Sequence, residues 1–237
     1  MKKIAVLTSG GDAPGMNACL RAIVRMGEEK GMDVVGVIGG YQGLVDGVFK
    51  PLSNQSVENI IHTGGTIIKT SRCDEFLTEK GFSKALANLK ANKIETLIVL
   101  GGDGSLKGAK KLAEENVQIV GIPCTIDNDI HYTDYTIGFD TAINTVANLL
   151  NNVKETISSH DRVCVVEVMG RHSGEIALMS GTASGAEVIL CPEMEITEKD
   201  YLNKIESSIK VGEKCVLVVV AEGYSSAEQV AKVIKAN

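Results

Sequence analysis

Short apolar runs alternate with amphipathic stretches along the whole chain. The apolar runs are short enough for buried strands and cover residues 4–7, 34–38, 96–99, 117–122, 162–168, 187–190 and 215–221. Helical periodicity appears between them, at about 16–30, 83–92, 106–115, 141–155 and 174–184, and from about 197 and 226 onward. Strands that alternate with helices favour parallel sheets covered by helices on both faces. The pattern therefore predicts an α/β protein built from doubly wound, Rossmann-like α/β/α lobes with mainly parallel sheets.

A glycine-rich turn, Gly101–Ser105, follows one of these runs directly and precedes a helical stretch. Open α/β sheets bind ligands at the carboxyl ends of their strands, and the free amides of a helix start favour an anion. The carboxylate of Asp103 fits such a site when a metal ion lies between it and the anion. The turn therefore predicts a nucleotide-phosphate site with Mg²⁺. A tight turn with Asp103 near the helix cap is the plainer alternative.

Two carboxylates, Asp127 and Asp129, lie in the loop that follows the run at 117–122. Side chains two residues apart in an extended loop point to opposite sides, so the two groups cannot be simple duplicates. One can act as a base on a hydroxyl, while the other tunes it or holds metal-bound water. An Asx-rich turn after a strand is the alternative interpretation.

Arginines occur at places that suit phosphate. Arg21 and Arg25 lie four residues apart, on one face of the first predicted helix, and Arg72 follows small hydroxyl residues in a loop. Arg171 lies in a third glycine-containing turn, after the strand at 162–168. Ordinary solvated surface positions remain the alternative for these side chains.

The best domain boundary lies near Gly138, between the Asp-rich loop and a long helix. We therefore expect one lobe at residues 1–138 that offers the nucleotide and Mg²⁺ site and the base, and a second lobe at 139–237 that offers arginines and Glu222. An active site in the cleft between the two lobes is expected.

Composition narrows the possible partners. The 237 residues carry a net charge of −6 and no Trp, and no basic run or interleaved aromatic stripe is present, so neither nucleic acid nor a membrane is expected as a partner. The apolar run after Lys2 and Lys3 is too short for a signal peptide. The cysteines form no CxxC pair, and several lie in apolar strands, which predicts a cytoplasmic protein without a disulfide framework or a zinc site.

Taken together, these stretches resemble the phosphofructokinase family. The motifs occur in the family's order and span essentially the whole chain: residues 4–17, Gly101-Gly102-Asp103-Gly104-Ser105, Thr125-Ile126-Asp127-Asn128-Asp129 and Val166-Glu167-Val168-Met169-Gly170-Arg171. NAD kinases and lipid kinases also carry a Gly-Gly-Asp-Gly turn, but they lack the accompanying motifs.

The resemblance implies transfer of the γ-phosphoryl group of ATP to the C1 hydroxyl of fructose 6-phosphate. It implies that Asp127 is the base, that Asp103 binds Mg²⁺, and that Thr125, Arg171 and Gly11 complete the catalytic set. The residues implied to line ATP are Gly11, Arg72, Cys73, Gly102, Asp103, Gly104, Ser105 and Gly108. Those implied to bind the sugar phosphate are Thr125, Asp127, Asp129, Arg162, Met169, Gly170, Arg171 and Glu222.

Two positions bear on the phosphoryl donor. Relatives that use pyrophosphate carry Asp where this chain has Gly104 and Lys where it has Cys124. A carboxylate at the first position would crowd and repel the α-phosphate of ATP, whereas glycine leaves room. The resemblance therefore implies ATP as the donor. It also implies a homotetramer, because the residue that matches Arg162 reaches the substrate phosphate of a neighbouring subunit.

The chain also departs from the family. The residues suited to an effector site at a subunit interface are Arg21, Arg25, Lys154, Gly185 and Glu187. The residues that replace expected basic or polar effector contacts are Asn54, Val211, Glu213 and Cys215, so effector control of the usual kind is doubtful. Leu77 replaces an Arg that often helps the nucleotide site. The family chain normally continues beyond Asn237, which leaves a non-catalytic nucleotide-binding fragment or regulatory subunit as the alternative function.

Overall fold

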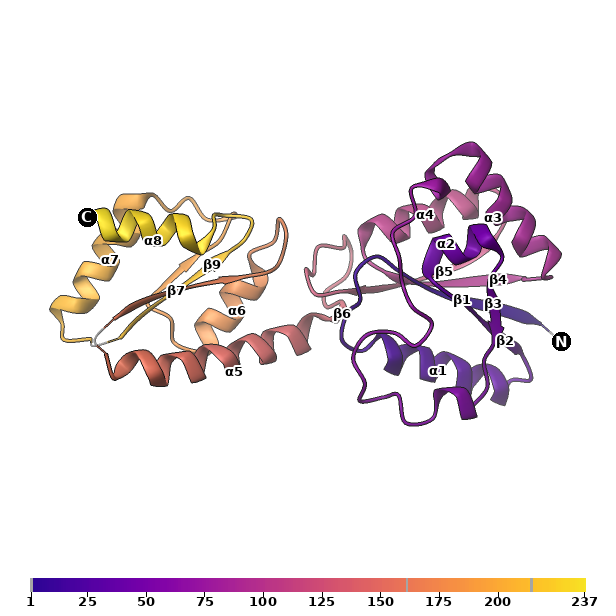
Figure 1. Ribbon diagram of the computed structural model, residues 1–237, viewed down its shortest axis with the longest axis horizontal. Helices are drawn as coiled ribbons and strands as arrows, with labels where there is room; N and C mark the ends of the chain where they lie inside the picture. Colours follow the sequence, from indigo (N-terminus) through magenta and orange to yellow (C-terminus); the bar gives the residue numbers. More distant parts are fainter. Residues whose placement is uncertain (1, 161, 214) are drawn as a thin grey trace. The chain divides into compact units, whose positions relative to one another are not determined.

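The computed structural model describes residues 2–160, 162–213 and 215–237, and they form two compact units. Unit 1 comprises residues 1–125 and 130–138, and unit 2 comprises residues 126–129 and 139–237. Figure 1 shows each unit as a sheet flanked by helices, in agreement with the predicted α/β class. No helix within the described residues is long and apolar enough to span a membrane.

Unit 1 contains a six-stranded sheet in the order β3-β2-β1-β4-β5-β6. The strands are β1 (Lys3–Ser9), β2 (Asp33–Val37), β3 (Phe49–Pro51), β4 (Thr96–Gly101), β5 (Gln118–Thr125) and β6 (Ile137–Gly138). All neighbouring pairs are parallel except β2 and β3. The chain leaves β1 to one side for β2 and returns on the other side at β4. The topological switch point therefore lies between β1 and β4.

Helices cover both faces of this sheet. They are α1 (Met16–Glu29), α2 (Gly40–Asp46), α3 (Glu79–Ala91) and α4 (Asp103–Glu114), with short 3₁₀ turns at η1 (Gln55–Val57) and η2 (Glu75–Leu77). Figure 1 shows α1 on one face and α2, α3 and α4 on the other. The first face buries Leu20 and Val24 of α1, and the second buries Leu44, Leu89 and Leu112 against β1 and β4. The four-residue spacing along α1 is the expected spacing of a one-sided apolar stripe.

Unit 2 contains a three-stranded parallel sheet in the order β7-β9-β8. Its strands are β7 (Val163–Val168), β8 (Val188–Leu190) and β9 (Val216–Ala221), and its helices are α5 (Phe139–Ser158), α6 (Glu175–Ala183), α7 (Glu198–Lys210) and α8 (Ala227–Ala236). Strand β9 is central and buried throughout. Leu217 and Val219 point into the core under α5 and α6, while Val218 and Val220 point into the core under α7 and α8. This alternation confirms a helix layer on each face.

Several short elements were not predicted. Helix α2 begins at Gly40, with Gly39 as its N-cap and both glycines in left-handed conformations, and β3 contains Pro51 at a sheet edge. Strand β6 spans only Ile137 and Gly138. These elements carry no apolar run or helical period long enough to detect, and the pairing of edge strands depends on distant parts of the chain. Helices α3 and α4 also begin a few residues earlier than the periodic pattern indicates.

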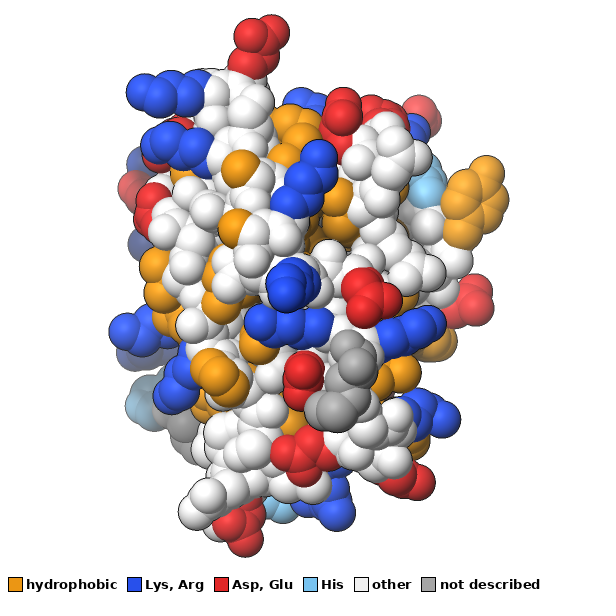
Figure 2. All heavy atoms as spheres, turned by 90° about the vertical axis from the view of Figure 1, so that its right-hand side faces the viewer, with side chains coloured by type: hydrophobic (Ala, Val, Ile, Leu, Met, Phe, Trp, Pro, Cys, Tyr) orange, Lys and Arg blue, Asp and Glu red, His pale blue; other side chains and the backbone are white. Residues whose placement is uncertain are grey.

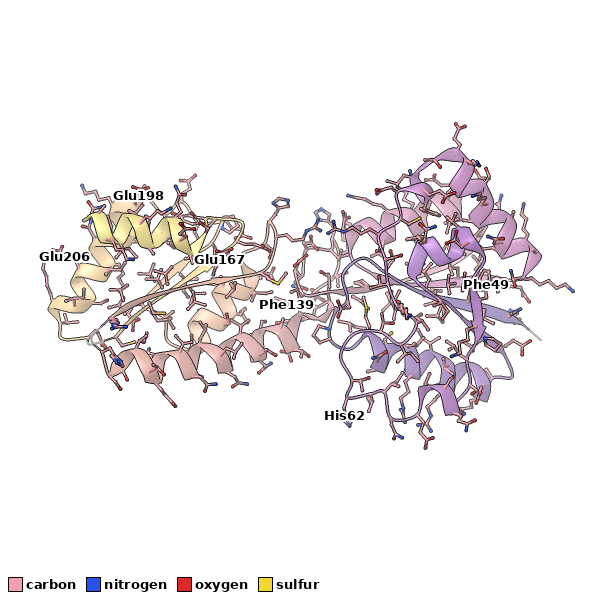
Figure 3. The ribbon with its side chains drawn as sticks, viewed as in Figure 1. Phe49, His62, Phe139, Glu167, Glu198 and Glu206 are labelled. Atoms are coloured by element: carbon pink, nitrogen blue, oxygen red, sulfur yellow. The ribbon has the colours of Figure 1, made fainter. Side chains whose placement is uncertain are left out.

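One segment differs from the expected division at Gly138. Residues 126–129, predicted to belong to the first lobe, belong to unit 2. The side chain of Ile126 packs against the core that contains Phe139, which Figure 3 labels at the start of α5. Burial of Ile126 therefore overrides its position in the sequence, next to β5.

Charges are interspersed on the face of the molecule drawn in Figure 2. Lysine and arginine side chains alternate there with aspartates and glutamates, and apolar side chains appear between them. No extended patch of one sign is visible on that face.

Candidate active site

The carboxyl ends of β1, β4 and β5 lie side by side in unit 1. Ser9 pairs with Gly101, and Gly101 pairs with Pro123. The turns after these strands therefore leave the same edge of the sheet, next to the switch point where such sheets bind ligands. The predicted residues Gly11, Gly102 and Thr125 come together at this edge.

The turn from Gly101 to Ser105 is shaped by close packing at one end and open space at the other. A Cβ added at Gly101 would lie 2.6 Å from the carbonyl oxygen of Ser9, so only glycine fits there. A Cβ at Gly104 would meet nothing within 4 Å. Gly102 caps α4 without a side-chain hydrogen bond, and its carbonyl accepts from the Ser105 amide at 3.0 Å, so Asp103 and Gly104 carry the first-turn amides that can face a ligand. This geometry suits an anion.

Asp103 opens α4, and its side chain is about half exposed. Its carboxylate accepts a hydrogen bond of 2.6 Å from Nζ of Lys107, one turn along the helix. No cluster of three or more His, Cys, Asp or Glu side chains within the described residues could hold a metal ion. A single carboxylate beside helix amides fits Mg²⁺ that takes its other ligands from nucleotide phosphates and water.

A long loop brings Arg72 and Cys73 toward this edge. The hydroxyl of Thr70 donates to the carbonyl of Gly10 at 2.7 Å, and that of Ser71 donates to the carbonyl of Gly39 at 2.7 Å. Arg72 is exposed, and Cys73 is half-buried. Burial raises the pKa of the Cys73 thiol, so this side chain is uncharged near neutral pH.

The same loop is anchored by Asn17, which is 1% exposed. Its amide nitrogen donates to the Thr63 and Gly64 carbonyls at 3.1 Å each, and its oxygen accepts from the amide of Ile67 at 2.9 Å. The sequence showed Asn17 only as part of a motif. Contacts across 46 to 50 residues explain its role as the residue that fixes the loop.

Gly108 lies beside an aromatic pair. A Cβ there would lie 3.0 Å from the hydroxyl of Tyr41 and 3.2 Å from the ring of Phe76, and the two rings stack with centroids 4.2 Å apart. The Tyr41 hydroxyl donates to the Ser105 carbonyl at 2.7 Å. Burial raises the pKa of Tyr41 above its ordinary value. Packing therefore explains the glycine here, independently of any nucleotide.

A hollow of about 280 Å³ adjoins this aromatic pair. Its walls include Phe76, Leu77 and Phe82 from η2 and α3, and Lys111 from α4. Phe76, Phe82 and Lys111 were not predicted as site residues. Phe76 and Phe82 lie far before the Gly101–Ser105 turn in the sequence, so no local signal links them to it.

The Asp-rich loop divides between the two units. Thr125 ends β5 in unit 1, close to Gly102: a Cβ at Gly102 would lie 3.6 Å from that of Thr125. Asp127 and Asp129 belong to unit 2. Asp127 is 8% exposed, whereas Asp129 is exposed, so the two carboxylates have different environments, as the loop pattern indicated.

Unit 2 brings four of the eight predicted acceptor residues to the carboxyl ends of β7 and β9. Val168 pairs with Ala221, so the Met169–Arg171 turn lies beside Glu222. One carboxylate oxygen of Glu222 accepts from the amide of Gly170 at 2.9 Å and from that of Arg171 at 2.6 Å. The side chains of Met169 and Arg171 are exposed. Glu222 therefore shapes the turn that presents Arg171.

Arg162 is not part of this group. It precedes β7, at the amino end of the strand, while Met169 follows the carboxyl end. The six residues of β7 separate Arg162 from the turn by the length of the strand. Within unit 2, the structure does not bring Arg162 together with the other predicted acceptor residues.

The predicted effector residues form two separate sets. Arg21 and Arg25 line a hollow of about 330 Å³ in unit 1 with Asn54, Gln55 and Glu58. In unit 2, Nζ of Lys154 donates to the Gly185 carbonyl at 2.8 Å and lies 3.6 Å from Glu187. Glu187 also accepts from the amide of Leu217 at 2.6 Å.

Cys124, at the end of β5, is 1% exposed. A hydrogen bond with the Cys19 side chain, together with burial, raises the pKa of the Cys124 thiol. The side chain at this position is therefore neutral and enclosed. A lysine ammonium would have to be desolvated to occupy the same place.

The glycine-rich turns at the switch point of unit 1 are of the kind that α/β enzymes use for phosphate-bearing ligands. The phosphofructokinase family model matches residues 3–237, and the chain therefore belongs to the phosphofructokinase family.

Individual relatives agree with this assignment. The chain is 51% identical over 235 residues to the ATP-dependent 6-phosphofructokinase of Clostridioides difficile and 52% identical to that of Clostridium botulinum strain Hall. Each match covers 99% of this chain and 74% of the relative. The structure superimposes on phosphofructokinase from Saccharomyces cerevisiae with a TM-score of 0.92 at 36% identity, covering all of this chain and 36% of the yeast chain.

Proposed function

We propose that the chain transfers the γ-phosphoryl group of ATP to the C1 hydroxyl of fructose 6-phosphate, giving fructose 1,6-bisphosphate and ADP in glycolysis. The observation that carries this proposal is the 51% identity, along 99% of the chain, to a relative named ATP-dependent 6-phosphofructokinase. The paired turns at the switch point of unit 1 supply a phosphate site that agrees with it.

Unit 1 is proposed to bind the nucleotide. The first-turn amides of α4, with Gly11 and Ser105, would hold the phosphates, and Arg72 would add positive charge. The aromatic hollow beside Gly108 is the right kind of surface for the adenine ring, because Phe76 and Phe82 offer apolar faces. The hollow touches α4 at Lys111, Glu114 and Glu115, about two to three helical turns from Asp103 at the phosphate end.

Asp103 is proposed to hold Mg²⁺ together with the nucleotide phosphates. The ion would neutralise phosphate charge as the γ-phosphoryl group is transferred. The Lys107 ammonium, which now pairs with the Asp103 carboxylate, would then be released toward solvent or a phosphate oxygen.

Asp127 is proposed to be the general base. Its carboxylate accepts the proton of the C1 hydroxyl while the hydroxyl oxygen bonds to the γ-phosphorus and the bond from that phosphorus to the bridging oxygen of ADP breaks. Thr125 and Asp129 lie beside it in the sequence. Arg171 would neutralise charge on the transferring group, and Glu222 holds the Arg171 turn in place.

ATP rather than pyrophosphate is the proposed donor. The open space at Gly104 leaves room for an α-phosphate, and the enclosed, neutral Cys124 stands where pyrophosphate-dependent relatives carry lysine. The position of Arg162, away from the other acceptor residues of unit 2, supports a role at a neighbouring subunit. We therefore propose a homo-oligomer, a homotetramer by family resemblance, and a cytoplasmic location in line with the free cysteines.

Control by a phosphorylated effector is proposed to be weak. Arg21 and Arg25 provide positive charge at their hollow, but Asn54 adds none. In unit 2, Lys154 is already satisfied by the Gly185 carbonyl and by Glu187. Little cationic charge is therefore left for an effector phosphate.

The test is formation of fructose 1,6-bisphosphate from ATP and fructose 6-phosphate by the purified chain and by Asp127→Asn. Removal of a general base should lower kcat by about 10²- to 10⁴-fold while ATP binding, measured by calorimetry, is retained. Asp33→Asn, at the exposed start of β2, is the matched control and should behave like the wild type.

Two outcomes would contradict the proposal in different ways. Binding of ATP without turnover by the wild-type chain would favour a non-catalytic nucleotide-binding protein or regulatory subunit. Turnover that is unaffected by Asp127→Asn would exclude Asp127 as the base and leave the reaction itself in place.

A further inference from the structure

The segment that carries Asp127 is fixed to unit 2 by two anchors. Ile126 packs into the core under α5 and α6. Asn128 donates from its side-chain amide nitrogen to Oε2 of Glu175 at 2.8 Å. Glu175 is the first residue of α6, where the helix dipole favours a carboxylate. A partly buried hydrogen bond to an ionised acceptor is among the stronger kinds in proteins.

The backbone conformation of Asn128 restricts the direction of the side chain that donates this hydrogen bond. Asn128 has φ of 52°, in the left-handed region that asparagine tolerates better than other side-chain-bearing residues. The residue thus forms a sharp corner between the buried Asp127 and the exposed Asp129. Holding the Asn128 side chain on Glu175 fixes that corner next to Asp127.

Glu175 also terminates the connection that carries Arg171. Glu222 holds the amides of Gly170 and Arg171, and Glu193 accepts from the amide of Gly174 at 2.8 Å. These carboxylates fix the connection between β7 and α6. The bond from Asn128 extends the same framework to the Asp127 segment, from a position 47 residues earlier in the chain.

We infer that Glu175 is a positioning residue that holds Asp127 in register with Arg171 by accepting the hydrogen bond of Asn128. This inference rests on the proposed phosphoryl transfer, in which Asp127 is the base. Glu175 does not itself touch the reacting atoms. Its loss acts through misplacement of Asp127, so it lowers kcat and leaves the KM for ATP, which unit 1 binds, unchanged.

The test uses the wild-type chain, Glu175→Ala, Asn128→Asp and the double variant Asn128→Asp/Glu175→Gln. Asn128→Asp sets two carboxylates against each other, whereas the double variant restores a donor and an acceptor with their roles exchanged. Each single variant should lower kcat by about 10- to 100-fold, and the double variant should recover most of the loss caused by Asn128→Asp. Glu206→Ala, on α7 in Figure 3, is the matched control and should leave kcat unchanged.

Amide hydrogen exchange of the peptide covering residues 126–130 gives a readout that does not need activity. Glu175→Ala should speed its exchange by at least about tenfold, and the double variant should restore protection relative to Asn128→Asp. Unchanged exchange in every variant, equal effects of Glu206→Ala, or a double variant no better than Asn128→Asp would overturn the inference. A wild-type chain that forms no product would instead refute the proposed function, while the exchange data still decide whether Glu175 anchors the segment.

Discussion

Glycines at the carboxyl edge of the sheet in unit 1 are present for different physical reasons. Gly101 is required by close packing against the Ser9 carbonyl, and Gly108 by the stacked rings of Tyr41 and Phe76. Gly104 has open space around it. No neighbour in unit 1 requires glycine at this position. The absence of a side chain can therefore determine which ligand fits there.

This difference leads to a prediction for Gly104→Asp. The variant should fold, because its side chain meets no atom nearby, but its carboxylate should repel the ATP phosphates. Adding a like charge beside the ATP phosphates should lower kcat/KM for ATP by about 100-fold, equivalent to about 2.7 kcal/mol. Steady-state kinetics with ATP and with pyrophosphate measure the effect.

Gly104→Ala is the control for this substitution, since it adds a Cβ without charge. Its kcat/KM for ATP should stay much closer to that of the wild type. Equal losses for the two variants would show that space, not charge, determines donor use at this position.

At the scale of secondary-structure elements, local sequence signals act together with packing to form each helix. Helix α7 begins with a full capping box: the Asp200 amide donates to the Thr197 hydroxyl, and the Asp200 carboxylate accepts from the Thr197 amide at 2.9 Å. Thr197 at the N-cap and an acidic first turn with Glu198 and Asp200 are a typical helix start. Both features are local, so they can be read without knowledge of the fold.

Thr197→Ala should lower the free energy of unfolding by about 1 kcal/mol, as is usual for loss of a helix N-cap. The Thr197 hydroxyl and amide also lower the pKa of Asp200. A lowered folded-state pKa contributes stability above the unfolded value, and this contribution is lost as the pH falls through the folded value. Thermal unfolding should therefore show that the difference between wild type and Thr197→Ala narrows as the solution is acidified below about pH 4.

Thr197→Ser provides the control, because its hydroxyl preserves the cap. A difference between wild type and Thr197→Ala that stays constant across this pH range would contradict a contribution from the Asp200 carboxylate.

At the scale of the whole molecule, two separate cores organise two separate sets of strand-end groups. Unit 1 holds the phosphate turns, and unit 2 holds Asp127, Arg171 and Glu222. The proposed assignment places ATP in unit 1 and fructose 6-phosphate in unit 2. It therefore predicts that the two ligands slow amide hydrogen exchange in different peptides.

MgATP should slow amide exchange in peptides covering residues 9–12 and 101–108, and fructose 6-phosphate should slow exchange in peptides covering 168–172 and 221–223. At about 100 times the dissociation constant, binding can add up to about 2.7 kcal/mol of protection. Fructose without its phosphate is the control ligand and should protect much less. Protection by fructose 6-phosphate confined to unit 1 would contradict the assignment.

Local spacing along the sequence determined the alternation of strands and helices, the mainly parallel sheets and the glycine-rich turns at strand ends. These features depend on side-chain periodicity and on backbone groups within a few residues, so they can be predicted from the sequence. The family motifs added the expected roles of Asp103, Asp127 and Arg171, which remain predictions about chemistry.

Only the tertiary structure decided which distant groups meet. Asn17 holds a loop about 50 residues away, Asn128 reaches Glu175 across 47 residues, and Ile126 takes the Asp127 segment into unit 2. Phe76 and Gly108 likewise meet through packing of η2 and α2 on α4. Such contacts cannot be predicted from the periodicity of the sequence. Their free energy comes from burial and from hydrogen bonds between segments that meet only when the chain folds.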